Sequence, residues 1–167
     1  MTSMGDDGFA AFYTASYQRL LGQLFAVTGD LAEAENLLQE AYARAFARWA
    51  QVRAYDFPEA WVRRVALNLA AMAARRLRRR AAALLRLGPP PTVPELSAEL
   101  LDLHHALRVL PLGQRQAIVL HHLAGLPVEE VASELGLPAG TVKSRLARGR
   151  RALAHMLDSD RPEVWQG

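Results

Sequence analysis

A row of hydroxyl and guanidinium groups near the C-terminal end of the sequence has the composition of a surface that reads nucleic acid. The row consists of Thr141, Ser144, Arg145, Arg148 and Arg151, with Lys143 and Arg150 on its flanks. On an α-helix, residues three or four positions apart lie on one face. Hydroxyls and guanidiniums bond base edges, and cations bind phosphates. The row therefore predicts a helix that enters the major groove of DNA.

The residues around this row follow the pattern of a helix-turn-helix over 126–153. Gly136 stands where the turn between the two helices needs positive φ, and Pro138 suits the first turn of the second helix. Apolar residues at helical spacing give each helix a buried stripe: Val128, Val131, Ala132 and Leu135, then Val142, Leu146, Gly149 and Leu153. The alternative is a solvated basic helix that binds nothing. The spacing of the turn and stripes favours the DNA-binding motif.

A second candidate surface combines aromatic and basic residues over 55–76. Tyr55 and Phe57 stand just before Pro58, which starts a helix that carries Trp61. The polar residues of that helix partly share one face, and they are Arg63, Arg64, Asn68, Arg75 and Arg76. Its apolar set also includes Val62, Val65, Ala66, Leu69 and Met72. Rings stack on unpaired bases while cations follow the backbone, so the segment suits single-stranded nucleic acid, although aromatics alone are more often core residues.

The whole chain of 167 residues is expected to be all-α, with two small helical domains joined by a flexible proline-rich linker. Periodicity predicts one helix from Phe9 to about Gly29 and a second over 31–49, started by an Asp30 cap with Glu33. A loop follows, and then the helix from Pro58. The first domain spans 9–80, the linker 81–95 and the second domain 96–157. The latter begins with two helices that end near Leu110 and Gly125. Their apolar sets are Leu96, Leu100, Leu103, Leu107 and Leu110 in the first, and Ala117, Ile118, Leu120 and Leu123 in the second. Residues 1–8 and 158–167 are expected to fray.

Composition excludes several functional classes. The net charge is only +3, but the basic residues are clustered, which favours a nucleic-acid partner. The absence of cysteine excludes disulfides and zinc fingers and fits the cytoplasm, and no segment indicates membrane insertion. Two adjacent pairs, His104–His105 and His121–His122, cannot chelate a metal because sequence neighbours point to different sides of a helix. No catalytic motif, cofactor site or metal site is indicated, so we expect no enzyme.

Three stretches together resemble the bacterial extracytoplasmic-function sigma factors, group 4 of the sigma-70 family. They are LAEAENLLQEAYARAFARW, DFPEAWVRRVALNLAAMAARRLRRR and LPLGQRQAIVLHHLAGLPVEEVASELGLPAGTVKSRLARGRRAL. The likeness covers about residues 9–80 and 96–155, in the order that the family shows. One departure is Met72, which stands where many members carry an aspartate.

The resemblance implies a role for each candidate surface. The segment with Glu35, Leu37, Leu38, Gln39, Glu40, Tyr42 and Arg44 looks like the one that grips the clamp helices of RNA polymerase. The stretch from Trp49 to Trp61, with Tyr55 and Phe57, is similar to the loop that captures a flipped minus-10 base. Arg64, Asn68, Arg75 and Arg76 lie where the family contacts minus-10 DNA. Thr141, Lys143, Ser144, Arg145, Arg148 and Arg151 match the helix that reads the minus-35 element.

The hypothesis that follows is an alternative sigma factor that binds core RNA polymerase, melts the minus-10 element and recognises the minus-35 element. We expect a monomer when the protein is free. Many such factors have an anti-sigma partner, whose target would be a hydrophobic groove between the domains. One rival is a stand-alone helix-turn-helix regulator, which would be a stable dimer on a palindrome. The other is an adaptor that binds only proteins, whose affinity would depend little on salt.

Overall fold

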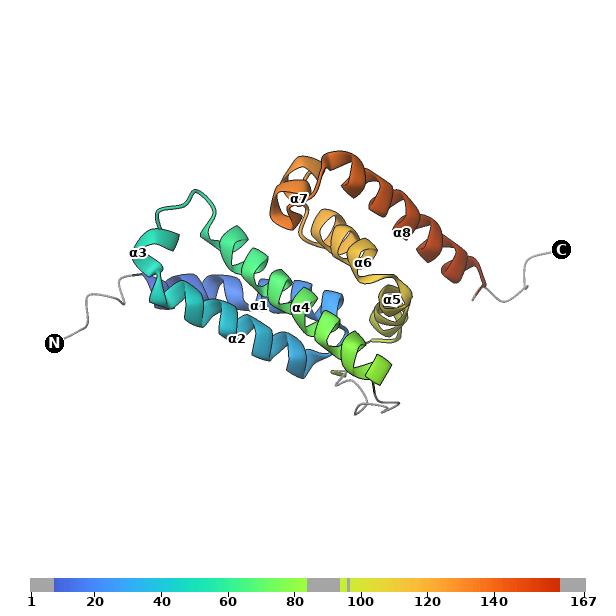
Figure 1. The fold of residues 1–167 in the computed structure, drawn as a ribbon, viewed down its shortest axis with the longest axis horizontal. Helices are drawn as coiled ribbons and strands as arrows, with labels where there is room; N and C mark the ends of the chain where they lie inside the picture. The colour runs from blue at the N-terminus through green and yellow to red at the C-terminus, as the bar shows by residue number, and fades with distance from the viewer. Residues whose placement is uncertain (1–7, 84–93, 96, 160–167) are drawn as a thin grey trace. The chain divides into compact units, whose positions relative to one another are not determined.

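The computed structural model describes residues 8–83, 94–95 and 97–159, and every element in those ranges is a helix (Figure 1). In chain order the elements are α1 (Phe9–Thr28), α2 (Leu31–Ala47), α3 (Trp49–Val52), α4 (Pro58–Ala83), α5 (Ala98–Val109), α6 (Leu112–Ile118), the π-helical turn η1 (Val119–Leu123), α7 (Val128–Leu135) and α8 (Ala139–Ser159). The prediction of an all-α chain is confirmed. The chain divides into two compact units, residues 1–94 and 95–167. Asp158 and Ser159, which were expected to fray, belong to α8. The rest of the expected tails, 1–7 and 160–167, lies outside the described residues, as do the glycine and the first three prolines of the expected linker.

The N-terminal unit is a bundle in which α2 packs on both α1 and α4. Gly29 ends α1 with a φ of 78°, and Asp30 caps α2 by accepting a 3.1 Å hydrogen bond from the Glu33 amide. The Asp30 amide donates to the Thr28 hydroxyl, at 3.3 Å, rather than to a returning glutamate. The core lies between the three helices and includes Leu20, Leu24, Val27, Leu38, Ala41, Ala45, Val62 and Ala66.

Aromatic rings close one end of this bundle. The indole of Trp49 is only 8% exposed, and its ring centroid lies 5.2 Å from that of Phe9 and 5.1 Å from that of Phe12. The segment after Trp49 was expected to be a loop from residue 50, but its first part is the short helix α3, anchored by the buried Val52. The connection without helical structure is therefore confined to 53–57.

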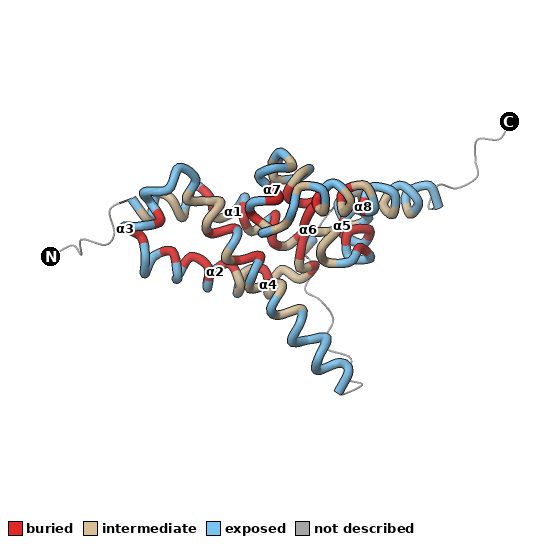
Figure 2. The backbone as a smooth tube through the Cα atoms, turned by 45° about the horizontal axis from the view of Figure 1, so that its top comes forward, coloured by how far each residue is buried: buried red, intermediate tan, exposed pale blue. Residues whose placement is uncertain are grey.

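Helix α4 is longer than its packed part. Residues 75–83 are all exposed, as Figure 2 shows for the C-terminal end of this helix, and they include the run of arginines. Three residues expected in the linker, Ala81 to Ala83, are thus helical. Alanine and arginine both have high helix propensity, so the segment stays helical without a packing partner.

The C-terminal unit is organised around α8, which packs on α5, α6 and α7. Its core includes Ala117, Leu120, Val131, Val142 and Leu146. The leucines of the helix before Pro111 were expected to form its buried face. This prediction is wrong for Leu100 and Leu103, which are 51% and 40% exposed. The buried face of α5 instead carries His104, Ala106 and Leu107, followed by Leu110 just beyond the helix, while Leu96 lies outside the described residues.

The helix expected to end near Gly125 changes its winding after Ile118. The Ala124 amide donates to the Val119 carbonyl at 2.9 Å, which is the i to i+5 spacing of a π-turn. The wider turn rotates the following residues relative to the core. Leu123, expected to be apolar core, is consequently 53% exposed.

Candidate nucleic-acid interfaces

Helices α7 and α8 form the helix-turn-helix that the sequence predicts. Gly136 has a φ of 64°, and the Leu137 amide donates to the Ala132 carbonyl at 2.9 Å, which gives α7 a Schellman ending. Pro138 stands directly before α8, where its carbonyl accepts from the Thr141 amide at 3.0 Å. These local contacts fix the angle at which α8 leaves the turn.

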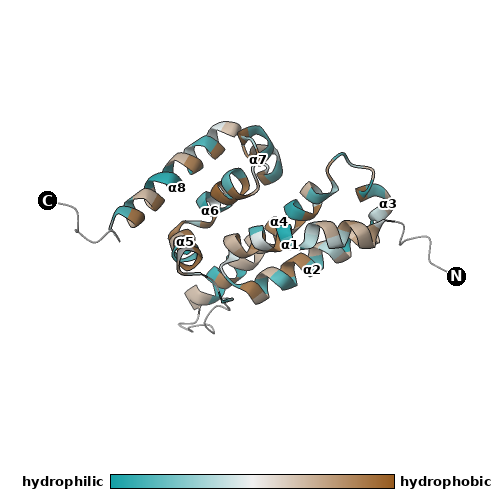
Figure 3. Cartoon of the chain, turned by 180° about the vertical axis from the view of Figure 1, so that it is seen from behind, coloured by the Kyte–Doolittle hydropathy of each residue, from teal (hydrophilic) through white to brown (hydrophobic). Residues whose placement is uncertain are grey.

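Helix α8 separates an apolar face from a basic one. Val142, Leu146 and Gly149 are buried, whereas Lys143, Arg148, Arg150 and Arg151 are exposed. Figure 3 shows hydrophilic and hydrophobic residues alternating along this helix. Thr141, Ser144 and Arg145 are half-buried at the edge of the basic face. The guanidinium of Arg145 lies against Gly113 at the start of α6.

The loop before α4 presents aromatic side chains beside a polar helix face. Phe57 is 75% and Tyr55 42% exposed, and Trp61 is half-buried. On α4 the exposed polar residues at helical spacing are Arg64, Asn68, Arg75 and Arg76. Met72, expected in the apolar stripe, is 47% exposed and lies within this row, because α4 at this point begins to extend past the packed part of the bundle.

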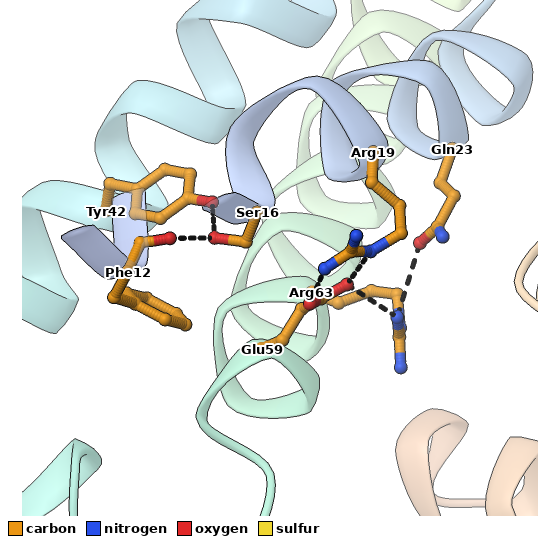
Figure 4. A network of polar contacts seen from close by, with 7 residues as sticks. All are labelled: Phe12, Ser16, Arg19, Gln23, Tyr42, Glu59 and Arg63. Carbon is orange, nitrogen blue, oxygen red and sulfur yellow. Dashed lines mark hydrogen bonds and ion pairs between the residues drawn. The ribbon is translucent and has the colours of Figure 1, made fainter. Parts of the chain in front are cut away.

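A partly buried polar network attaches α4 to α1 (Figure 4). Arg63 is 8% exposed, and its Nη1 donates to Oε1 of Gln23 at 3.3 Å and lies 3.8 Å from Oε1 of Glu59. Glu59 also accepts from Nε of Arg19 at 2.8 Å. Arg63 was expected on the polar face with Arg64, but its side chain is buried against α1, where Gln23 accepts its hydrogen bond. No feature of the sequence separates it from the exposed Arg64 beside it.

The candidate polymerase-binding residues of α2 fall into two groups. Gln39, Glu40 and Arg44 are exposed and Glu35 and Leu37 half-buried, and Arg44 pairs with Glu40 at 2.9 Å. In contrast, Leu38 is 0% and Tyr42 3% exposed, so neither side chain is available for contact with a partner. The prediction that Leu38 and Tyr42 contact the polymerase is therefore wrong, because α1 covers α2 on one side and α4 covers it on the other.

Tyr42 instead joins α2 to α1. Its hydroxyl lies 2.6 Å from that of Ser16, which also donates to the Phe12 carbonyl at 2.7 Å. Burial raises the pKa of Tyr42 to about 12, partly offset by the hydrogen bond with Ser16. Tyr42 is therefore a neutral structural residue at ordinary pH.

The two histidine pairs contain one buried side chain, His104, and one side chain that bonds to the backbone, His121. His104 is 4% exposed, and Nδ1 of His121 lies 2.8 Å from the Leu126 carbonyl oxygen. Desolvation lowers the pKa of His122, and the charges of His121 and Arg150 lower it further. Among residues 8–83, 94–95 and 97–159, no group of three or more potential ligands is placed to hold a metal ion. None of the helices in these ranges is long and apolar enough to cross a membrane.

Comparison with known proteins assigns both units to one family. Residues 12–80 match the family model for sigma-70 region 2, and residues 100–153 match that for sigma-70 region 4. The RNA polymerase sigma-E factor of Streptomyces coelicolor is 33% identical over 150 residues, which cover 89% of this chain and 83% of that protein. The extracytoplasmic-function RNA polymerase sigma factor SigM of Mycobacterium tuberculosis is 31% identical over 145 residues, which cover 84% and 73%.

A solved structure shares the fold. The sigma factor RpoE of Bartonella quintana, crystallised with the anti-sigma factor NepR, aligns with a TM-score of 0.76 at 24% identity over 92% of this chain and 98% of that one. The two matched regions and the two relatives indicate the same family. This chain belongs to the sigma-70 family of RNA polymerase sigma factors, within the extracytoplasmic-function group.

Proposed function

We propose that the N-terminal domain, residues 9–80, binds core RNA polymerase and the minus-10 element, and that the C-terminal domain, residues 96–157, reads the minus-35 element. Residues 81–95 would connect the two. The surface offered to the polymerase clamp helices is the outer side of α2, formed by Glu35, Leu37, Gln39, Glu40 and Arg44. Leu38 and Tyr42 would support this surface from the core.

The exposure of Phe57 is the observation that carries the minus-10 part of the proposal. A phenyl ring that is 75% exposed contributes little hydrophobic stabilisation to the fold. We infer that this ring serves to contact a ligand. Tyr55 lies two residues before it, α4 starts directly after it, and the exposed polar row of that helix begins at Arg64. An unstacked base could lie against Phe57, Tyr55 or Trp61 while Arg64, Asn68, Arg75 and Arg76 follow the phosphates.

The basic face of α8 has the composition expected of a major-groove helix. Lys143, Arg148 and Arg151 are exposed cations, and Thr141 and Ser144 supply hydroxyls beside them. We infer that these residues, together with Arg145, contact the minus-35 element. Two weakly binding domains on one chain gain specificity when both are held by polymerase, since each raises the effective concentration of the other at its element.

The protein would act in the cytoplasm as a monomer until it meets polymerase, and it would supply binding and strand separation rather than catalysis. The solved relative was crystallised with an anti-sigma factor, and we propose that a protein of that class also restrains this chain. Leu100 and Leu103 of α5 give such a partner two exposed apolar side chains at helical spacing.

Reconstituted transcription tests the proposal. The purified chain is mixed with core polymerase and a promoter library, and the selected promoter is then used with the Phe57→Ala variant. Strand opening is measured by the reactivity of unpaired thymines. We expect it to fall in the variant, while binding of the chain to core polymerase is unchanged. Val109→Ala, which removes a side chain that is 71% exposed in the other unit, is the matched control. Tight binding of the free protein to duplex operators as a dimer would contradict the proposal.

A further inference from the structure

The guanidinium of Arg145 lies directly over the backbone of Gly113, in the first turn of α6. A Cβ placed on Gly113 would stand 2.7 Å from Nη1 of Arg145, 2.8 Å from its Cζ and 3.3 Å from its Nε. A Cβ essentially never lies within 3.0 Å of a heavy atom outside its own residue and the neighbouring backbone. The guanidinium therefore occupies space that exists only because residue 113 has no side chain.

Arg145 keeps its hydrogen-bonding capacity in this position. In the part of the chain that the structure describes, no ion pair or hydrogen bond of Arg145 is found. A guanidinium is permanently charged and has five N–H donors. The group beside Gly113 can thus still donate to a phosphate or to the acceptors of a guanine.

We propose that Gly113 is a positioning residue for minus-35 recognition, which sets the direction in which Arg145 offers its guanidinium to DNA. The inference rests on the proposed role of α8. Contact with α6 restricts the rotamers of a long side chain before DNA arrives, so less freedom is lost on binding. Gly113 itself would not touch DNA.

The proposal predicts that a methyl group at residue 113 changes recognition without harming the fold. The atoms that a new Cβ would meet belong to the far end of a flexible side chain, which can turn away. Gly113→Ala should therefore move Arg145 while α6 and α8 remain in place. Since alanine favours helix over glycine, the thermal stability of the variant should be unchanged or slightly higher.

A double-mutant cycle tests this mechanism. Holoenzyme is assembled with wild-type chain, Gly113→Ala, Arg145→Ala or both, and its affinity is measured for a selected promoter and for the same promoter with a scrambled minus-35 element. Arg145→Ala should reduce the ratio of the two affinities by roughly 5- to 150-fold if the arginine contacts a base. Gly113→Ala should reduce it by at least about twofold. In the Arg145→Ala background, Gly113→Ala should cause no further loss.

Gly22→Ala on α1 is the matched control, because a Cβ there meets nothing within 4 Å, and it should leave the ratio unchanged. The inference is overturned if Gly113→Ala keeps the full ratio, or if it causes the same loss in the presence and absence of the arginine. A different result separates the two proposals: if neither Arg145→Ala nor Arg148→Ala alters the ratio, the role of α8 is wrong, and the inference fails with it.

Discussion

Gly149 on α8 faces Ile118 on α6 so closely that an added Cβ would come 2.9 Å from the isoleucine Cγ1. Ile118 is 6% exposed and branched at its Cβ, so this atom cannot swing aside as the end of an arginine can. The absence of a side chain at Gly149 therefore sets the distance between the two helices that form the core of the C-terminal unit.

Gly149→Ala should destabilise this unit. Overpacking costs about 1–3 kcal/mol, and the better helix propensity of alanine offsets about 1 kcal/mol of that. The net loss is up to about 2 kcal/mol. Gly140→Ala on the same helix, where a Cβ meets nothing within 4 Å, should instead be neutral or stabilising. Hydrogen exchange of the α6 and α8 amides measures the difference, and equal protection in both variants would contradict the packing argument.

The buried Ser16–Tyr42 pair predicts a loss of stability at alkaline pH. The pKa of Tyr42 is raised to about 12 in the fold from about 10 in the unfolded chain. Its contribution to stability is therefore fully present below pH 10 and is lost as the pH rises toward 12. Tyr42→Phe should remove this pH dependence and cost about 0.5–1.5 kcal/mol at neutral pH for the lost hydrogen bond. Denaturant unfolding between pH 8 and 12 checks this. An unchanged pH profile in the variant would exclude Tyr42 as the cause.

Local signals allowed the sequence to predict much of the fold and of the α8 face. Gly29, Asp30 and Gly136 act within one turn of the chain, so their roles do not depend on what packs nearby. The exposed face of α8 follows from helical periodicity alone, since only one side of that helix carries apolar residues.

The sequence-based predictions were wrong or missing for residues whose environment depends on elements distant in the chain. Tyr42 fits a polymerase-binding segment by position, yet α1 covers it. Met72 continues an apolar stripe whose packing partners end before it does. Gly113 offers no signal in a single sequence, because its importance comes from a side chain that is 32 positions further along and reaches it only in the folded unit.

The Arg19–Glu59–Arg63 network predicts unequal effects for its members. Arg19 is an exposed partner, so Arg19→Ala should cost less than about 1 kcal/mol. Glu59→Ala should cost more, about 1–3 kcal/mol, because it leaves the buried Arg63 with less compensation for its charge. Chemical denaturation of variants that also carry Trp165→Phe, monitored by the fluorescence of Trp49 and Trp61, reports on this unit. Equal losses in the two variants would show that burial of Arg63 does not matter.

The polar face of α4 predicts a defined salt dependence. If Arg75 and Arg76 each bind a phosphate, replacing both by alanine should weaken promoter binding by the holoenzyme. It should also reduce the logarithmic salt slope by about 0.7–0.9 per residue, depending on whether the strand is single or double. Arg108→Ala on α5 removes another exposed cation, outside the proposed DNA surface, and should leave the slope unchanged. The slope depends on the number of phosphate contacts and not on the stability of the fold. A variant that only damaged the fold would therefore lose affinity equally at every salt concentration, and its slope would be unchanged. Such parallel lines would remove both arginines from the minus-10 surface.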